Sequence, residues 1–254
     1  MWNKPQLMIA VSDLLYVAGT ASLLVAGLIW GAHLPLFPLR EVVFQNELRE
    51  VKRAEIERSL AGRLRGNFFS VNLDSLRQAL EELPWIRHAE VRRQWPGRIE
   101  ISVEEHMPVA SWGQGSGQLV NSYGEVFSAV MSEPPPKPLP LLVGPVGMAR
   151  EMLDYFHLAE DLLAPVNRWP KALNVSARQA LQLRLDDGMI VELGRQQAKA
   201  PIRQRLERLV EHYPSVMTAA RQRPSVVDMR YPNGFALRVA AVAPAAATES
   251  KGKQ

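Results

Sequence analysis

The stretch LLYVAGTASLLVAGLIWGAHLPL, residues 14–36, decides how the rest of the chain is organised. It contains no Asp, Glu, Lys or Arg, and most of its residues are Leu, Val, Ala, Ile or Gly. A helix of about 20 apolar residues spans a bilayer core and satisfies its own backbone hydrogen bonds. Tyr16 and Trp30 lie toward its ends, where amphipathic rings favour the headgroup layer. The sequence therefore predicts one transmembrane helix. The alternative is a buried core helix, which the length of the run disfavours.

A cleaved signal peptide is a further alternative for this segment. Such peptides have a basic start, a shorter apolar region and a small-residue cleavage site. Here the apolar run is longer, the start is weakly basic and no Ala-x-Ala site follows, so an uncleaved anchor is favoured. Its orientation stays open at this point. The basic C-terminal flank favours an outside N-terminus, whereas long domains translocate regardless of charge.

The composition restricts the classes of function. The 254-residue chain has a formal net charge of +4 and no cysteine. The lack of cysteine excludes a disulfide scaffold, thiolate metal sites and a cysteine nucleophile. The basic residues are dispersed, which is typical of a solvated surface rather than of a nucleic-acid site. About 200 residues remain outside the anchor and a tail, which suits one large or two small domains.

Residues 38–106 predict a small α+β unit with its helices against one face of a sheet. The expected elements are a strand over 40–45, helices over 51–64 and 73–83, and hairpin strands over 86–94 and 98–105. Apolar residues three and four apart predict the helices, and alternation of apolar and polar residues predicts the last strand. Gly66 is expected to end the first helix, Asn72 to cap the second and Pro84 to end it.

Residues 107–240 predict a mixed β domain with flanking helices. The expected strands are 109–112, 118–121, 125–127, 180–185, 189–193, 225–229 and 235–239. The expected helices are 148–163 and 198–212. In the second helix Ile202, Leu206, Leu209 and Val210 form the apolar stripe, and Arg205 and Arg208 are expected outside it. Residues 241–254 are Ala-rich and then rich in Lys, Ser and Gly, which predicts a disordered tail.

The inventory of reactive groups is nearly empty. The five histidines are scattered, and no pair has metal-ligand spacing with a third donor, so no metal site or cofactor is expected. Glu104 and Glu105 are adjacent in a strand and therefore point to opposite faces. Arginines make one hairpin basic, which favours a solvated face, with contact to lipid headgroups as an alternative: Arg87, Arg92, Arg93 and Arg98. No catalytic residues are expected, and the sequence favours binding over catalysis.

The last predicted strand is the best local candidate for a binding site. Residues 235–239 are apolar, close to the C-terminus and expected at a sheet edge. An exposed edge offers unpaired N–H and C=O groups to a strand of a partner. The alternative is an edge that is shielded by the tail or by Arg238.

Several motifs together resemble the FtsQ (DivIB) family of bacterial cell-division proteins. Residues 83–112 are similar to the end of that family's POTRA domain and its junction with the β domain, and residues 119–127 to the first β-domain hairpin. The later motifs are Leu193-Gly194-Arg195 and Asp228-Met229-Arg230-Tyr231 with Gly234. The likeness covers nearly the whole chain, in order, together with a single N-terminal anchor.

The resemblance implies a non-catalytic, single-pass type II scaffold of the inner membrane, enriched at the division septum. Residues 1–13 would be a cytoplasmic stub, 38–106 the POTRA domain and 107–240 the β domain, both periplasmic. The β domain would bind FtsB, which pairs with FtsL, and FtsK and FtsW are candidate partners of the POTRA domain and membrane segment.

In this family the partner adds a strand along the edge formed by the last β strands. The implied binding residues are Arg195, Arg230, Tyr231, Gly234, Phe235, Ala236, Leu237 and Val239. Tyr231 would be the aromatic anchor. The chain departs from the family after Gly234, where some members have small residues and then Trp.

Two rival functions come from other classes. A POTRA-containing accessory factor for protein transport or outer-membrane assembly would be expected to carry tandem POTRA units, of which the sequence shows one. An anchored cell-wall enzyme would need a clustered nucleophile or metal site, and the sequence shows neither.

Overall fold

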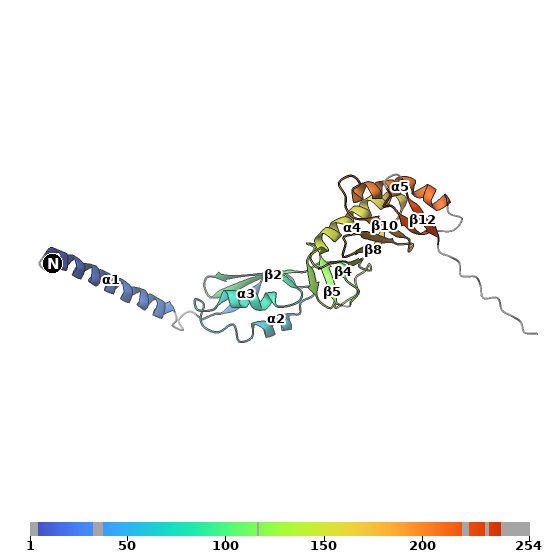
Figure 1. Ribbon diagram of the computed structural model, residues 1–254. Helices are drawn as coiled ribbons and strands as arrows, with labels where there is room; N and C mark the ends of the chain where they lie inside the picture. The colour runs from blue at the N-terminus through green and yellow to red at the C-terminus, as the bar shows by residue number, and fades with distance from the viewer. Residues whose placement is uncertain (1–4, 33–37, 116, 220–223, 232–233, 240–254) are drawn as a thin grey trace, which may run out of the picture. The chain divides into compact units, whose positions relative to one another are not determined.

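The computed structural model describes residues 5–32, 38–115, 117–219, 224–231 and 234–239 (Figure 1). The start of the predicted stub (1–4), the end of the predicted membrane segment (33–36) and the predicted tail (241–254) lie outside these residues. The chain divides into two compact units, Met1–His106 and Met107–Gln254.

The first helix, α1 (Pro5–Ala32), contains the apolar run. Its stretch Ile9–Gly31 is long and apolar enough to cross a membrane, and none of it is buried. The helix begins at Pro5, so residues 5–13, predicted as part of a stub, are helical as well. The hydroxyls of Thr20 and Ser22 donate to carbonyls one turn back, at 2.8 Å to Tyr16 and Ala18, so these polar groups are satisfied within the helix.

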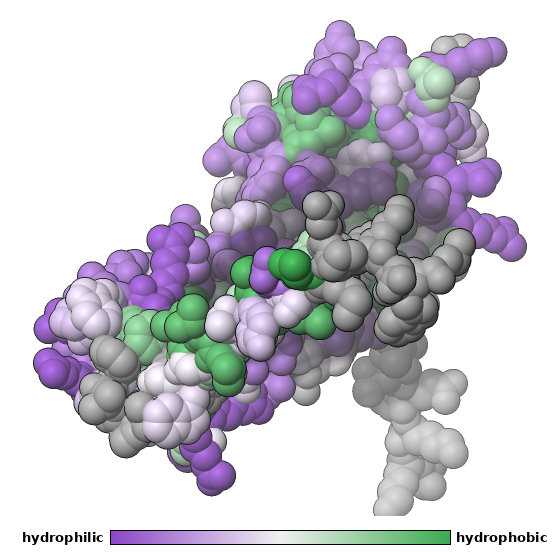
Figure 2. Space-filling view, turned by 90° about the vertical axis from the view of Figure 1, so that its left-hand side faces the viewer, coloured by the Kyte–Doolittle hydropathy of each residue, from purple (hydrophilic) through white to green (hydrophobic). Residues whose placement is uncertain are grey.

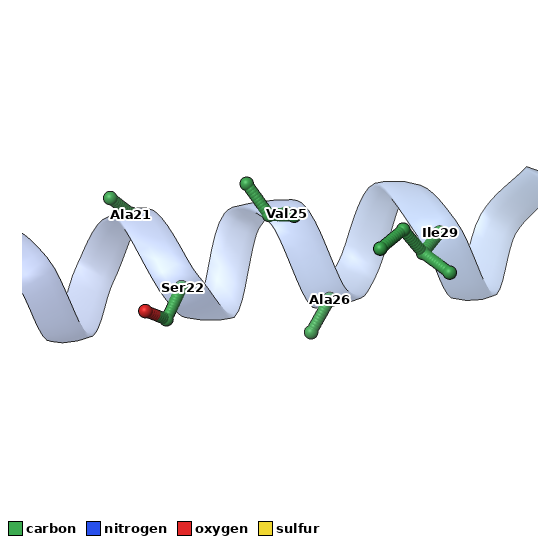
Figure 3. Close-up of a pocket in the computed structure, with 5 residues that line it drawn as sticks. All are labelled: Ala21, Ser22, Val25, Ala26 and Ile29. Atoms are coloured by element: carbon green, nitrogen blue, oxygen red, sulfur yellow. The ribbon is translucent and has the colours of Figure 1, made fainter.

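One side of α1 carries a shallow hollow (Figure 3). It is lined by Ala21, Ser22, Val25, Ala26 and Ile29. The side chains that line it all belong to this single helix and point away from its axis.

The rest of the first unit is an α+β domain in the predicted order. Its elements are β1 (Glu41–Phe44), α2 (Arg53–Leu60), α3 (Leu73–Glu81), β2 (Ile86–Gln94) and β3 (Arg98–Glu105). Among the described residues these strands form a three-stranded sheet, β1-β3-β2, in which β3 is parallel to β1 and antiparallel to β2. The alternation in β3 has the predicted effect, because Ile99 and Ile101 are fully buried. Asn72 caps α3 as predicted, since its Oδ1 accepts from Ser75 N–H at 3.0 Å.

The helix α2 is shorter than predicted. It ends at Leu60 rather than near Leu64, because Ala61 leaves the helical conformation and Gly62 adopts a left-handed one, with φ of 82°. A glycine just past the last turn takes this conformation at little cost, so Gly62 rather than Gly66 ends the helix.

The second unit is built on a mixed sheet. Its strands are β4 (Pro108–Trp112), β5 (Gln118–Asn121), β6 (Val126–Ser128), β7 (Leu141–Val143), β8 (Pro170–Val175), β9 (Leu181–Leu185), β10 (Ile190–Gly194), β11 (Pro224–Asp228) and β12 (Ala236–Val239). Within the described part of the chain they form a nine-stranded sheet in the order β12-β11-β10-β9-β8-β7-β4-β5-β6. The pairs β4–β7, β7–β8 and β10–β11 are parallel and the others antiparallel.

Two helices cover one face of this sheet (Figure 1). They are α4 (Ala149–Leu163), which a short 3₁₀ turn (Ala164–Val166) follows, and α5 (Ile202–Ala219). Helix α4 contacts β7 and β8, α5 contacts β10, and the two helices contact each other. The core between them and the sheet contains Phe156, Leu163, Leu183, Val191 and Leu206, all buried.

Candidate partner-binding site

The last strand lies at one edge of the nine-stranded sheet. β12 pairs antiparallel with β11 only, and within the described residues no strand pairs with its other side. The paired residues are Pro224 with Val239, Val226 with Arg238, Val227 with Leu237, and Asp228 with Ala236. An edge of this kind presents backbone N–H and C=O groups along its open side.

A β-bulge shows which backbone groups face outward. The pairing shifts between Pro224 and Val226, and Ser225 Oγ donates to the Arg238 carbonyl at 3.0 Å. The carbonyl of Arg238 therefore faces β11. Because the direction of these groups alternates along a strand, the N–H and C=O groups of Leu237 and Val239 face away from β11.

The side chains of β12 divide between the two faces of the sheet. Leu237 and the preceding Phe235 are half-buried against the core, and the Phe235 ring lies 6.2 Å from the His212 ring of α5. Ala236 and Arg238 are exposed on the opposite face, and Val239 is exposed at the end of the strand. The apolar side chains of this strand thus pack mainly against the core of the β domain, and the backbone groups on its open side stay available to a partner.

The strand directions bring the other predicted residues to one end of the sheet. β10 and β11 are parallel, so their carboxyl ends lie at the same end, and the antiparallel β12 starts there. Arg195 follows β10, Arg230 and Tyr231 follow β11, and Gly234 precedes β12. Gly194 has a left-handed φ of 71°, and a Cβ on it would lie 3.0 Å from Arg230 Cγ. This glycine therefore lets the turn at Arg195 lie directly against Arg230.

Arg230 is held by a carboxylate at the end of β11. Its Nε and Nη2 donate to the two oxygens of Asp228 at 2.8 and 2.6 Å, and its backbone N–H donates to Oδ1 at 3.0 Å. Hydrogen bonds from Arg230 hold the pKa of Asp228 below its usual range, although burial opposes this shift. The same bonds raise the pKa of Arg230, so it stays a cation.

Two arginines of α5, absent from the predicted site, position its loops. Arg208 Nη1 donates to the Tyr231 carbonyl at 2.8 Å. Arg205 Nη1 donates to the carbonyls of Leu193 and Arg195, the latter at 2.8 Å. Burial lowers the pKa of Arg205, and the neighbouring Arg208 lowers it further.

The prediction that Arg205 lies outside the apolar stripe was wrong. Only 3% of this residue is exposed. It stands three residues after Ile202 and four before Leu209, so helical spacing places it within the stripe, and this signal was available in the sequence.

At this end of the sheet the exposed side chains include one aromatic ring and two arginines. Tyr231 is 56% exposed, and Arg195 and Arg230 are exposed beside it. In the space-filling view hydrophilic side chains predominate and hydrophobic ones appear in separate patches (Figure 2).

Acidic residues away from this surface have structural partners. Glu104 binds Arg87 at 3.0 Å, and the Glu105 carboxylate accepts from the N–H groups of residues 49–51. Asp186 and Asp187 bind Arg168 at 3.0 and 3.6 Å. Among the described residues no group of three His, Cys, Asp or Glu side chains is placed to hold a metal ion.

Comparison with known proteins identifies the family. Two family models match, "POTRA domain, FtsQ-type" over residues 37–106 and "Cell division protein FtsQ/DivIB, C-terminal" over residues 110–230. Relatives named cell division protein FtsQ include those of Burkholderia pseudomallei (37% identical, 94% of this chain and 95% of the relative) and Nitrosospira multiformis (37%, 94% and 99%). A third, from Bordetella pertussis, is 33% identical over 100% of this chain and 98% of the relative.

The chain belongs to the FtsQ family. The resemblance stated from the motifs is thereby confirmed, as is the α+β class with a POTRA domain. Membership in the FtsQ family gives the chain a role in cell division. The match to the C-terminal FtsQ model ends at residue 230, so Tyr231 and β12 lie past it, and their role is taken up as a proposal.

Proposed function

We propose that this FtsQ-family protein is a non-catalytic scaffold of the division machinery that binds FtsB, paired with FtsL, along β12. Helix α1 holds it in the inner membrane as a single-pass type II protein with residues before the span in the cytoplasm. Residues 38–106 form the POTRA domain and 107–240 the β domain, both in the periplasm at the septum. FtsK and FtsW are further candidate partners, through the POTRA domain and the membrane segment.

The observation that carries this proposal is the edge position of β12. The backbone groups of Leu237 and Val239 face away from β11, and a partner strand that pairs with them would extend the sheet. Recognition through backbone hydrogen bonds tolerates changes of side chain. The different residues that follow Gly234 in this chain are therefore compatible with the proposal.

Side chains at the start of β12 supply specificity. The ring of Tyr231 is large and exposed, and Arg208 holds the backbone carbonyl of this residue in place. Tyrosine is a residue type favoured at binding hot spots. Arg195 adds an exposed positive charge at this end of the sheet, while the charge of Arg230 is paired with Asp228. A partner segment with acidic side chains beside its pairing strand complements this surface.

Backbone pairing is tested with full-length protein in nanodiscs and a purified FtsB–FtsL complex. Val239→Pro removes an N–H that faces away from β11, whereas Val239→Ala shortens the side chain and keeps the N–H. We expect Val239→Pro to weaken binding about tenfold or more, roughly 1.4 kcal/mol, and Val239→Ala to bind nearly as the wild type. Equal affinities for the two variants, with unchanged melting temperatures, would refute strand addition.

The aromatic anchor is tested in the same assay. Tyr231→Ala is expected to cost about 2 kcal/mol or more of binding free energy, and Tyr231→Phe much less. Truncation before Phe235 is a poorer test, because it also removes the core contacts of Phe235 and Leu237. In cells, a photo-crosslinker at position 231 or at the exposed position 236 should capture FtsB, and capture of other proteins alone would contradict the proposal.

A further inference from the structure

The POTRA domain exposes two aromatic rings, Trp95 in the turn between β2 and β3 and Phe69 in the loop before α3. Trp95 is 65% exposed and Phe69 is 45% exposed, while Phe68 between them is buried. The Phe68 ring lies edge-on to both, with centroids 6.0 Å from Trp95 and 5.1 Å from Phe69. We call Phe69 and Trp95, with the turn 95–97, the aromatic tip.

Polar contacts hold the aromatic tip in place. Arg93 of β2 donates to the carbonyls of Phe68, Phe69 and Val71 at 2.9, 3.2 and 2.6 Å. The Oδ1 of the buried Asn67 accepts from the N–H groups of Phe69 and Ser70 at 3.0 and 2.8 Å. The rings are therefore presented from a fixed loop, and docking them costs little conformational entropy.

The aromatic tip lies beside the segment that leaves the membrane anchor. The Arg40 N–H donates to the Gly97 carbonyl at 2.8 Å, and a Cβ on Gly97 would lie 3.0 Å from the Pro38 carbonyl oxygen. Helix α1 ends at Ala32. The chain from Ala32 to Pro38 spans at most about 21 Å when fully extended, at roughly 3.6 Å per residue. Covalent connection alone keeps the aromatic tip within reach of the bilayer surface.

The chemistry around the aromatic tip matches a lipid headgroup layer. Amphipathic rings such as Trp favour this layer over both water and hydrocarbon. The exposed Arg40 packs against the turn, and Arg98 lies next to it in an ion pair with Glu41 at 3.1 Å. A guanidinium group can donate two parallel hydrogen bonds to the oxygens of one phosphate, so these arginine side chains suit phospholipid phosphates.

We propose that the aromatic tip rests in the headgroup layer of the bilayer that α1 crosses, and so fixes the POTRA domain against the membrane. This inference rests on the anchoring role of α1 in the proposed function. In this proposal the aromatic tip contacts lipid, whereas the edge strand β12 binds a partner protein.

Spin labels on the full chain test this directly, because the natural sequence has no cysteine. Three single-cysteine variants are reconstituted in vesicles of phosphatidylcholine and phosphatidylglycerol. Gln94→Cys lies next to the aromatic tip, and Leu24→Cys lies in α1. Met107→Cys is the matched control: it is 64% exposed and follows the far end of β3, about 26 Å away at 3.3 Å per residue.

The measurement compares accessibility to oxygen with accessibility to a water-soluble nickel complex. We expect the ratio at position 94 to be several-fold higher than at 107, and lower than at 24. When Phe69→Ala and Trp95→Ala are added to the Gln94→Cys variant, the accessibility ratio at position 94 should fall to the ratio at position 107. That result supports contact through the two rings.

Two other outcomes overturn the proposal in distinguishable ways. Aqueous readings at both 94 and 107, with position 24 in the bilayer core, would refute the lipid contact and leave the anchor intact. An aqueous reading at 24 would refute the anchor, and the lipid contact with it.

Discussion

The hairpin β2–β3 of the POTRA domain and the pair β11–β12 of the β domain are both antiparallel, yet their surroundings differ. β3 is paired on both sides, by β1 and β2, whereas β12 is paired on one side among the described residues. Side chains of β2 and β3 also bind loop backbone, through Arg93 and Glu105. In the POTRA hairpin the second strand, β3, is internal and the first, β2, lies at the sheet edge among the described residues, whereas in the pair β11–β12 the second strand is the edge strand that keeps backbone groups for a partner.

The two domains are also stabilised by different means. In the β domain the apolar faces of α4 and α5 pack on the sheet, and Phe156 is buried at the centre of this core. In the POTRA domain a smaller core is supplemented by polar contacts from strand to loop. Substitutions in each domain should therefore separate the two contributions.

The largest effect is expected from Phe156→Ala. Removal of a buried ring leaves a cavity that costs about 3–5 kcal/mol, and we expect the β domain to unfold at lower temperature while the POTRA domain stays folded. Calorimetry with limited proteolysis distinguishes the two domains. Val146→Ala, at an exposed position, is the control and should change little. A single transition that shifts for both domains together would contradict this separation.

A smaller effect is expected from Glu105→Gln in the POTRA domain. The carboxylate accepts from Arg49 N–H and Val51 N–H at 2.9 Å each and from Glu50 N–H at 3.2 Å. Loss of these charge-assisted bonds should cost about 1–3 kcal/mol and speed amide exchange at residues 49–51. Glu104→Gln is the matched neighbour and should cost at most about 1 kcal/mol, because its ion pair with Arg87 is partly exposed to solvent. Similar costs for both would show that the strand-to-loop contact matters little.

The smallest effect is expected from the pair Asp228 and Arg230 in the β domain. Because folding lowers the pKa of Asp228, the carboxylate stabilises the fold above its unfolded pKa, about 3.9, and this stability is lost as the pH falls through the lower folded pKa. Asp228→Asn should therefore cost at most about 1 kcal/mol near pH 7, since Arg230 is largely exposed. Urea unfolding at a series of decreasing pH values should show the unfolding free energies of the wild type and of Asp228→Asn converge. A difference in free energy that persists in acid would show that it does not come from the charge of the Asp228 carboxylate.

Local signals predicted most elements of both domains. Asn72 and the spacing of apolar residues predicted α3, and alternation predicted β3. These signals work because caps, periodicity and turn residues act over a few neighbouring positions.

Other features escaped prediction because they depend on distant partners. β7 is three residues long and β8 starts at a proline, so neither has a strong pattern of its own, and both depend on their neighbours in the sheet, β7 on β4 and β8, and β8 on β7 and β9. Helical spacing alone places Arg205 within the apolar stripe, but its hydrogen-bond partners, the carbonyls of Leu193 and Arg195, come from β10 and the turn after it, which a helical pattern does not display.

The sequence by itself determined an apolar N-terminal helix, an α+β order with one POTRA domain and membership in a family, because each is written in local composition and motif. Only the tertiary structure decided that β12 is an edge, that Arg195, Arg230 and Tyr231 meet at one end of the sheet, and that Trp95 packs against Phe68. These are pairings between residues far apart in the chain, and their geometry follows from strand direction and packing rather than from any single stretch of sequence.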